Sequence, residues 1–213
     1  MGTENTENKL NDLLAQYAAG HLAQPLHVLV ASHLAMTSKN RGFVSSLESL
    51  NGAGLENAEP QTLGNRERML NHIFASQQTS ASRPSHDQIF PAPLHRFIGK
   101  NLDQINWRRR ILGLRDYEIG TKNGFEANLF WIKAGHRIPS HTHEGSEVTL
   151  VLKGAFSDQN GIFRRGDIAI ADAEVDHSPV ASKDEDCLCY AVTDARLRLT
   201  GPLGRVIERF LKH

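Results

Sequence analysis

The first 76 residues carry apolar positions at the spacing of helices. Three short stretches carry an apolar stripe, with apolar positions at Leu10, Leu13, Leu14 and Tyr17, at Phe43, Val44, Leu47 and Leu50, and at Met69, Leu70, Ile73 and Phe74. A fourth stretch, over 26–36, is apolar over most of its length and is expected to be largely buried. Gly20 suits the end of the first helix, Pro25 the first turn of the second, and Asn51-Gly52 the end of the third. Helices this short are stable only when their apolar faces are packed. We therefore expect the four helices to pack on each other or on a partner.

In the second half of the chain the apolar residues recur at every second position. Apolar and polar residues alternate over 125–132 and again over 147–152, as expected for strands. The strands are separated by the turn signals Asn123-Gly124, Lys153-Gly154, Asn160-Gly161 and Arg165-Gly166-Asp167. This succession of short strands predicts an all-β domain of the sandwich or barrel type.

Between the two patterns lies a stretch rich in Ser, Gln and Pro. We place a linker there, at 77–93, between a helical domain at 1–76 and a β domain at 94–213. Gly201-Pro202 and the apolar positions that follow predict a terminal helix. The predicted fold class is α+β: a short four-helix domain followed by an all-β barrel with a terminal helix.

Composition narrows the functional classes. The chain has 24 Lys and Arg against 24 Asp and Glu, and residues 1–80 carry five Lys and Arg against seven Asp and Glu, which argues against direct nucleic-acid binding. No run of 18 apolar residues occurs and the first residues are polar, so we expect a cytoplasmic protein without a membrane segment. The oligomeric state stays open.

Candidate metal ligands are concentrated in the β region. His141 and His143 are two apart, so in a strand both imidazoles leave the same face. The wider pattern is Gly135, five residues, His141-Thr142-His143, three residues, Glu147, six residues and Gly154, then Gly166-Asp167 and, eleven residues after Gly166, His177. This spacing resembles the two-part signature of metal-binding cupins (double-stranded β-helix or jelly-roll barrels), with all four ligand positions filled. The resemblance implies one divalent ion, zinc by preference, with manganese, iron or nickel as alternatives.

Cys187 and Cys189 flank Leu188 in an apolar run, where they share one face of a strand. We favour buried, reduced thiols with a packing role. The alternative is a redox-sensitive pair, which requires a lowered thiol pKa or a neighbouring metal.

The whole layout resembles the ChrR family of anti-sigma factors. The segments that carry this resemblance are 13–22 (LLAQYAAGHL), 31–34 (ASHL), 129–132 (LFWI), 147–156 (EVTLVLKGAF) and 191–195 (AVTDA). It implies that the helical domain binds an extracytoplasmic-function (ECF) sigma factor and blocks its access to core RNA polymerase. It also implies that the cupin is needed for release in response to singlet oxygen or organic peroxides.

One departure concerns a zinc site that such proteins carry in the helical domain, in a His-x-x-x-Cys-x-x-Cys run with an earlier histidine. His33 is present, but Thr37 and Asn40 stand at the cysteine positions and Asn8 at the earlier histidine position. One imidazole cannot hold a structural zinc. We therefore expect this amino-terminal site to be empty, with apolar stripes holding the helices instead.

The leading hypothesis is thus a non-enzymatic regulator whose cupin metal centre controls its hold on a sigma factor. The alternative is a metal-dependent cupin enzyme of the dioxygenase, decarboxylase or isomerase type, since three histidines and a glutamate serve both classes. A ligand-binding sensor is a third option. The absence of an evident acid, base and oxyanion set beside the ligands favours regulation over catalysis.

Overall fold

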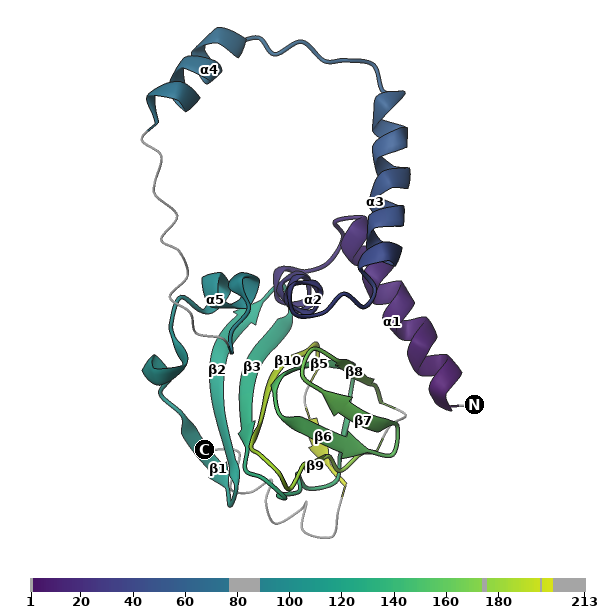
Figure 1. Ribbon diagram of the computed structural model, residues 1–213, viewed down its shortest axis with the longest axis vertical. Coiled ribbons are helices and arrows are strands. Elements are labelled where there is room, and N and C mark those ends of the chain that lie inside the picture. The colour runs from purple at the N-terminus through teal and green to yellow at the C-terminus, as the bar shows by residue number, and fades with distance from the viewer. Residues whose placement is uncertain (1, 77–88, 174–175, 196, 201–213) are drawn as a thin grey trace.

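The computed structural model describes residues 2–76, 89–173, 176–195 and 197–200, and shows helices followed by a small barrel (Figure 1). The helices are α1 (Gly2–Ala18), α2 (Gln24–Met36), α3 (Arg41–Glu56), α4 (Arg66–Ala75), α5 (Ala92–Ile98) and the 3-10 helix η1 (Leu102–Gln104). The strands are β1 (Arg108–Ile111), β2 (Leu114–Lys122), β3 (Phe125–Ile132), β4 (His141–His143), β5 (Glu147–Lys153), β6 (Ala155–Asp158), β7 (Gly161–Arg164), β8 (Ile168–Ala171), β9 (Val180–Ala181), β10 (Cys187–Thr193) and β11 (Leu197–Leu199).

The four predicted helices and the α+β class are confirmed, with two differences. Helix α3 continues past Asn51-Gly52 to Glu56, because a glycine costs an exposed helix only about 1 kcal/mol and no strand follows to fix a turn there. Helix α5 was not anticipated from the Pro-rich composition. It begins after Pro91 and has a proline in its first turn. Proline fits there because the backbone N–H groups of the first turn have no acceptor within the helix. The predicted terminal helix lies outside the described residues.

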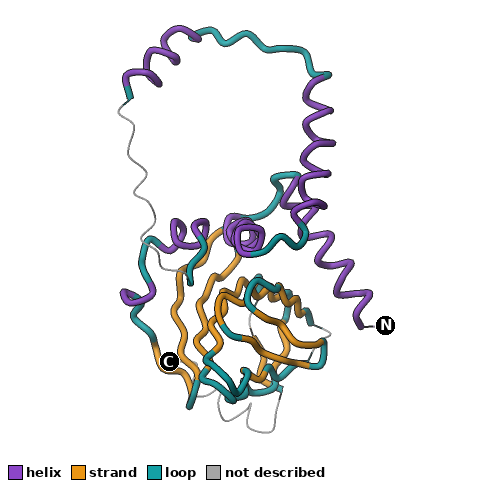
Figure 2. Tube along the Cα trace, in the orientation of Figure 1, coloured by secondary structure: helices purple, strands orange, loops and turns teal. Residues whose placement is uncertain are grey.

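Antiparallel pairing builds the barrel. One sheet has the order β1-β2-β3-β10-β5-β8, a second has the order β7-β6-β9, and β4 pairs with β11. Figure 2 shows the strands wrapping around a common interior below the helices. Asn123 and Gly124 both have positive φ, 53° and 82°, and form the two-residue β2–β3 hairpin that the sequence predicts.

Two neighbouring strands of the large sheet, β10 and β5, are buried along almost their whole length. Because side chains alternate across a strand, each of these two strands contributes to two different clusters. Leu150 and Tyr190 belong to a cluster shared with the helices, whereas Val151, Cys187 and Cys189 belong to a cluster inside the barrel. The same two strands thus form the floor under the helices and a wall of the barrel interior.

Helix α2 packs on the outer face of this floor. Its residues Leu29 and Val30 are fully buried in the shared cluster, and the buried Tyr190 hydroxyl donates a hydrogen bond to the Pro25 carbonyl at 3.1 Å. Helix α1 is tied to the end of β8 by an ion pair between Lys9 and Asp172. These contacts place α1 and α2 directly on the barrel.

Helices α3 and α4 have far less support. Val44 is the only buried residue of α3, and α4 buries none of its side chains among the described residues. The two helices and their connection stand away from the barrel as an arch (Figure 1). Asn51 of α3 is tied to α1 through a hydrogen bond to the Ala18 carbonyl at 3.2 Å. Among the described residues, none of the helices has the length and apolarity needed to cross a membrane.

Packing of α2 on the sheet gives a direct stability prediction. Replacing Leu29 by alanine removes a fully buried side chain, so we expect a loss of roughly 2–5 kcal/mol in the free energy of unfolding. Leu55 on α3 is 75% exposed, and Leu55→Ala should change that free energy by less than about 0.5 kcal/mol. Urea denaturation followed by circular dichroism measures both. Equal losses in the two variants would contradict the packing described.

Candidate metal centre

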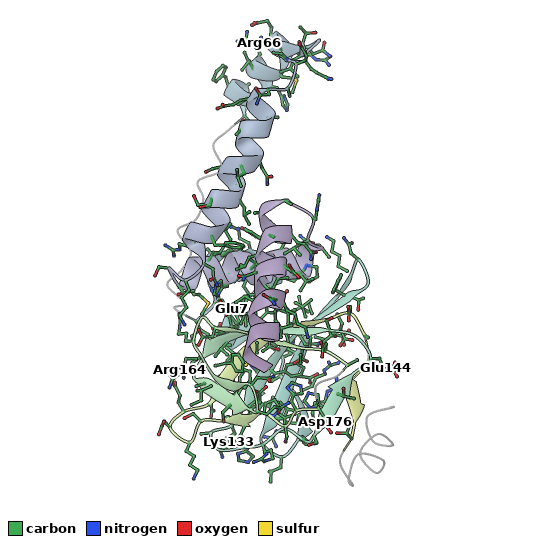
Figure 3. The ribbon with its side chains drawn as sticks, turned by 90° about the vertical axis from the view of Figure 1, so that its right-hand side faces the viewer. Glu7, Arg66, Lys133, Glu144, Arg164 and Asp176 are labelled. Carbon is green, nitrogen blue, oxygen red and sulfur yellow. The ribbon has the colours of Figure 1, made fainter. Side chains whose placement is uncertain are left out.

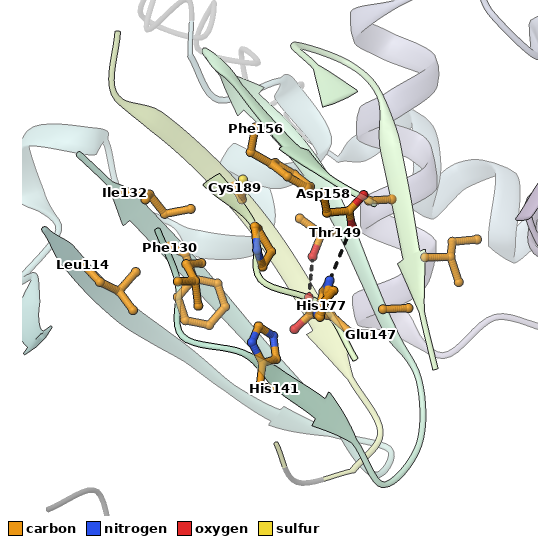
Figure 4. Close-up of a pocket in the computed structure, with 15 residues that line it drawn as sticks. Leu114, Phe130, Ile132, His141, Glu147, Thr149, Phe156, Asp158, His177 and Cys189 are labelled. Atoms are coloured by element: carbon orange, nitrogen blue, oxygen red, sulfur yellow. Dashed lines mark hydrogen bonds and ion pairs between the residues drawn. The ribbon is translucent and has the colours of Figure 1, made fainter. Parts of the chain in front are cut away.

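Three of the four predicted ligands meet inside the barrel (Figure 4). His141 starts β4 and Glu147 starts β5, while His177 precedes β9 and is paired with His141 through two backbone hydrogen bonds of 3.0 Å. One potential ligand atom from each of the three residues lies within 4.8 Å of the others. His141 and His177 are buried. This geometry allows all three side chains to bind one ion.

The fourth predicted ligand, His143, occupies the last position of β4, opposite Leu197 of β11. Its side chain lies outside the part of the structure that is described. Its role as a ligand therefore stays a prediction, based on the two-residue spacing from His141.

Polar contacts at Nδ1 indicate which ring nitrogen of each histidine is left for a metal. Nδ1 of His141 lies 2.8 Å from the Pro139 carbonyl, so it carries the proton and leaves the Nε2 lone pair for a metal. Nδ1 of His177 lies 3.5 Å from the Asp158 carboxylate, which favours the same tautomer. Thr149 donates a hydrogen bond to Glu147 Oε1 at 3.2 Å. Two imidazole nitrogens and a carboxylate with this orientation suit a borderline divalent cation.

Asp158 is a site residue that the sequence did not reveal. It ends β6 beside the turn at Asn160-Gly161, and an aspartate at that position is typical of an ordinary turn. Its side chain is only 3% exposed, and its Oδ1 atom accepts a hydrogen bond from the Asn160 amide at 2.8 Å. The contact of Oδ2 with His177 depends on folding of β6 over the interior, which no local pattern specifies.

A cavity of about 100 Å³ adjoins the three candidate ligands (Figure 4). Apart from the ligands, Thr149 and Asp158, its walls are mainly apolar, and they include Leu114, Phe130, Ile132, Ile138, Phe156, Ala169, Ile170, Ala171, Pro179 and Cys189. Low-polarity walls strengthen the electrostatic interactions of any ion held there.

Both cysteines are free and buried, as the packing interpretation expects. Their sulfur atoms are 3.5 Å apart on one face of β10, and Cys189 lines the cavity. The hydrogen bond to Cys187, then burial and the negative charge of Glu147, raise the pKa of the Cys189 thiol well above its ordinary value. A thiol in this environment stays protonated and is a poor nucleophile.

His33 has a structural role at the junction of helices and barrel. Its Nδ1 lies 2.6 Å from the Gly166 carbonyl in the β7–β8 turn, and its Nε2 lies 3.1 Å from Asn40 Nδ2. One neutral tautomer satisfies both contacts, with Nδ1–H donating to Gly166 and Nε2 accepting from Asn40. Among the described residues, no group of three potential ligands occurs around His33. The asparagine at the second expected cysteine position thus hydrogen-bonds the histidine directly.

A helical amino-terminal segment packed on a barrel whose interior clusters two histidines and a glutamate as potential metal ligands defines a protein of the cupin class. Residues 98–196 match the ChrR cupin-like domain family. The chain is 37% identical over 204 residues to the anti-sigma-E factor ChrR of Cereibacter sphaeroides, covering 94% of this chain and 95% of that protein. The chain belongs to the ChrR family of anti-sigma factors.

A solved structure shows the same arrangement. The chain is similar to one from the crystal structure of Rhodobacter sphaeroides SigE in complex with the anti-sigma factor ChrR, with a TM-score of 0.73 and 36% identity. The match covers 86% of this chain and 96% of that one. The helical segment and the barrel are therefore both part of the shared structure.

The contact between Asp158 and His177 predicts a metal-affinity effect. Asp158→Asn keeps a carbonyl oxygen for the Asn160 amide but removes the negative charge beside His177, so the affinity for zinc should fall about 10–100-fold. Competition against a chromophoric chelator measures the change. The exposed Asp103 supplies the control, since Asp103→Asn should leave the affinity unchanged. Equal affinities of wild type and Asp158→Asn would show that the carboxylate does not support the ligand.

The environment of His33 predicts a pH dependence of stability. Burial lowers the pKa of His33 below 6.5, and the opposing effects of the Gly166 carbonyl and Asp167 are smaller. The unfolded chain therefore takes up this proton at a higher pH than the folded chain. The stability that the neutral imidazole contributes is complete above about pH 6.5 and is lost as the pH falls toward the lowered pKa.

Thermal melts at about pH 7.5 and about pH 5.5 test this dependence, because the interval spans the titration of histidine. The glutamine side chain in His33→Gln cannot titrate. The melting temperature of this variant should therefore fall less between about pH 7.5 and about pH 5.5 than that of the wild type. His21→Gln alters an exposed histidine and should behave as the wild type does. An identical pH response in wild type and His33→Gln would contradict the proposed neutral state.

Proposed function

We propose that this chain is a cytoplasmic anti-sigma factor that binds an ECF sigma factor through residues 1–76 and releases it when oxidative stress disturbs the cupin metal centre. The proposal treats 94–213 as the sensing domain and 77–93 as a linker. Family membership supports it, as does the similarity to the ChrR–SigE complex. Membership in a family of anti-sigma factors also favours regulation over the metalloenzyme alternative.

The observation that carries the partner proposal is an exposed apolar surface on the arch. It consists of Phe43, Leu50 and Leu55 on α3, Leu63 in the connection, and Met69, Ile73 and Phe74 on α4. Leu55 is 75% exposed and Phe74 is 80% exposed. Helices of this length need a packed apolar face, and the described barrel does not cover these residues. A folded partner that buries this arch surface supplies the missing contacts.

Loss of the amino-terminal zinc ligands is compatible with partner binding. Helix α2 is held by the core that it shares with the sheet, and His33 joins it to the β7–β8 turn. The exposed ion pair between Lys39 and Asp167 at 2.7 Å adds a second contact to that turn. We propose that these interactions do what a zinc ion does in relatives that keep its ligands.

For the sensor, we propose one zinc ion held by His141, His143, Glu147 and His177. Four protein ligands of nitrogen and oxygen type match a closed, tetrahedral zinc site. Manganese, iron and nickel are the alternatives that metal analysis of the purified chain distinguishes. Oxidation by singlet oxygen or an organic peroxide would alter the ligands, and β5 and β10 connect the site to α2.

The arch surface predicts the outcome of a binding experiment with the ECF sigma factor encoded nearest to the gene for this chain. Ile73→Glu places a charge in the apolar surface of α4 and should weaken binding roughly 30-fold or more, as expected for an interface hot spot. Asn71→Glu introduces the same charge at an exposed polar position of the same helix and should bind normally. Surface plasmon resonance measures both affinities.

Two results would overturn the proposal. The first is failure of the wild-type chain to bind that sigma factor at micromolar concentrations. The second is turnover of an oxidisable small molecule by the metal-loaded chain, lost in His141→Ala, which would favour the enzyme alternative.

A further inference from the structure

A pair of like charges lies at the edge of the large sheet. Arg109 on β1 is directly opposite Arg115 on β2, and Arg115 is in turn directly opposite Trp131 on β3. Residues directly opposite each other in antiparallel strands share a face, with Cβ atoms about 4.5–5.5 Å apart, and like charges at such positions are destabilising. Folding therefore works against a cross-strand repulsion at this position.

On the opposite face of the β1–β2 hairpin, the arginines are paired with carboxylates. Arg108 and Arg110 both approach the Asp116 carboxylate at 2.9 Å, and Arg108 also approaches Glu118 at 3.3 Å. The acidic residues of β2 are thus engaged on that face. Among the described residues, no carboxylate is paired with Arg109 or Arg115.

A second observation is a cavity of about 340 Å³ over the uncompensated face. Both arginines line it, and so do Lys133 and Trp131. The remaining lining residues are Ile111, Leu112, Gly113, Leu114 and Asp186. The volume lies in the range of small-molecule pockets.

The one carboxylate in this cavity is already engaged. Asp186 accepts hydrogen bonds of 2.8 Å from the Ala134 amide and from the Trp131 indole N–H. These bonds keep the pKa of Asp186 low, so it stays ionised and offsets one of the three cationic side chains. Two positive charges remain in excess around the cavity.

We propose that this cavity binds a small organic anion, with a phosphate head group held by Arg109 and Arg115 and a flat apolar body against Trp131. Two guanidinium forks side by side match the oxygens of a phosphate, and an anion between them removes their mutual repulsion. The indole ring and the apolar side chains of the β1–β2 hairpin suit an aromatic body.

The proposed anion site lies away from the arch surface and on the other side of the sheet from the metal ligands, although Leu114 lines both cavities. Figure 3 shows Lys133 at the end of the molecule opposite Arg66 of α4, so the cavity lies far from the arch surface. Trp131 and Leu129 occupy the same face of β3, because residues two apart in a strand point the same way. Leu129 is buried in the core shared with the helices, whereas Phe130 and Ile132 point into the metal-site cavity. The anion would thus occupy the outer face of the sheet.

Isothermal titration of the full, metal-loaded chain with phenyl phosphate tests the proposal. Wild type should bind with a dissociation constant below about 1 mM, and more tightly than it binds inorganic phosphate or phenol. Arg109→Ala and Arg115→Ala should each weaken binding roughly tenfold or more, because each loses a charge-assisted hydrogen bond. Lys122→Ala removes the same charge from the far end of β2 and should bind as the wild type does.

Thermal melts accompany the titrations and show whether each variant is folded. Removing Arg109 relieves the cross-strand repulsion, so the melting temperature of Arg109→Ala without ligand should stay level or rise. Absence of phenyl phosphate binding to the wild type would overturn the proposal. So would equal weakening in Lys122→Ala, which would indicate attraction to overall charge rather than a built site.

Discussion

Burial of β5 and β10 on both faces is the constraint on which the other features depend. Each strand has one set of side chains under α2 and the alternate set facing the barrel interior, where Glu147 and Cys189 lie. The hydrogen bond from Tyr190 to the Pro25 carbonyl fixes the helix on this sheet. A shift of either strand by one residue would exchange the two faces, so the metal centre and the helix position are set together.

This shared core divides the helical segment into an anchored part and an exposed part. Helices α1 and α2 belong to the barrel through buried side chains and through His33. In helices α3 and α4 the arch surface is exposed among the described residues, which fits the proposed binding role. Among the described residues, the contacts that join the arch to the metal-site strands run through α1 and α2, so under the proposed function α2 would connect the metal centre with partner binding.

Sequence patterns predicted the features that depend on local spacing. Period two located β3 and β5, and the spacing of His141, Glu147 and His177 identified three side chains that the fold brings together. Contacts between segments that are distant in the sequence could not be predicted from it. The bond from His33 to Gly166 spans 133 positions, and the pairing of Arg109 with Arg115 depends on a strand register that side-chain alternation alone does not specify. Asp158 was missed because aspartate in a turn has an ordinary local explanation.

Amide hydrogen exchange in α2, measured on the zinc-loaded chain before and after chelation, tests the coupling most directly. If β5 and β10 transmit the state of the metal centre, removal of the ion should speed exchange in those strands and also in Gln24–Met36. Faster exchange confined to β4 and the segment around His177, with α2 unchanged, would contradict the coupling.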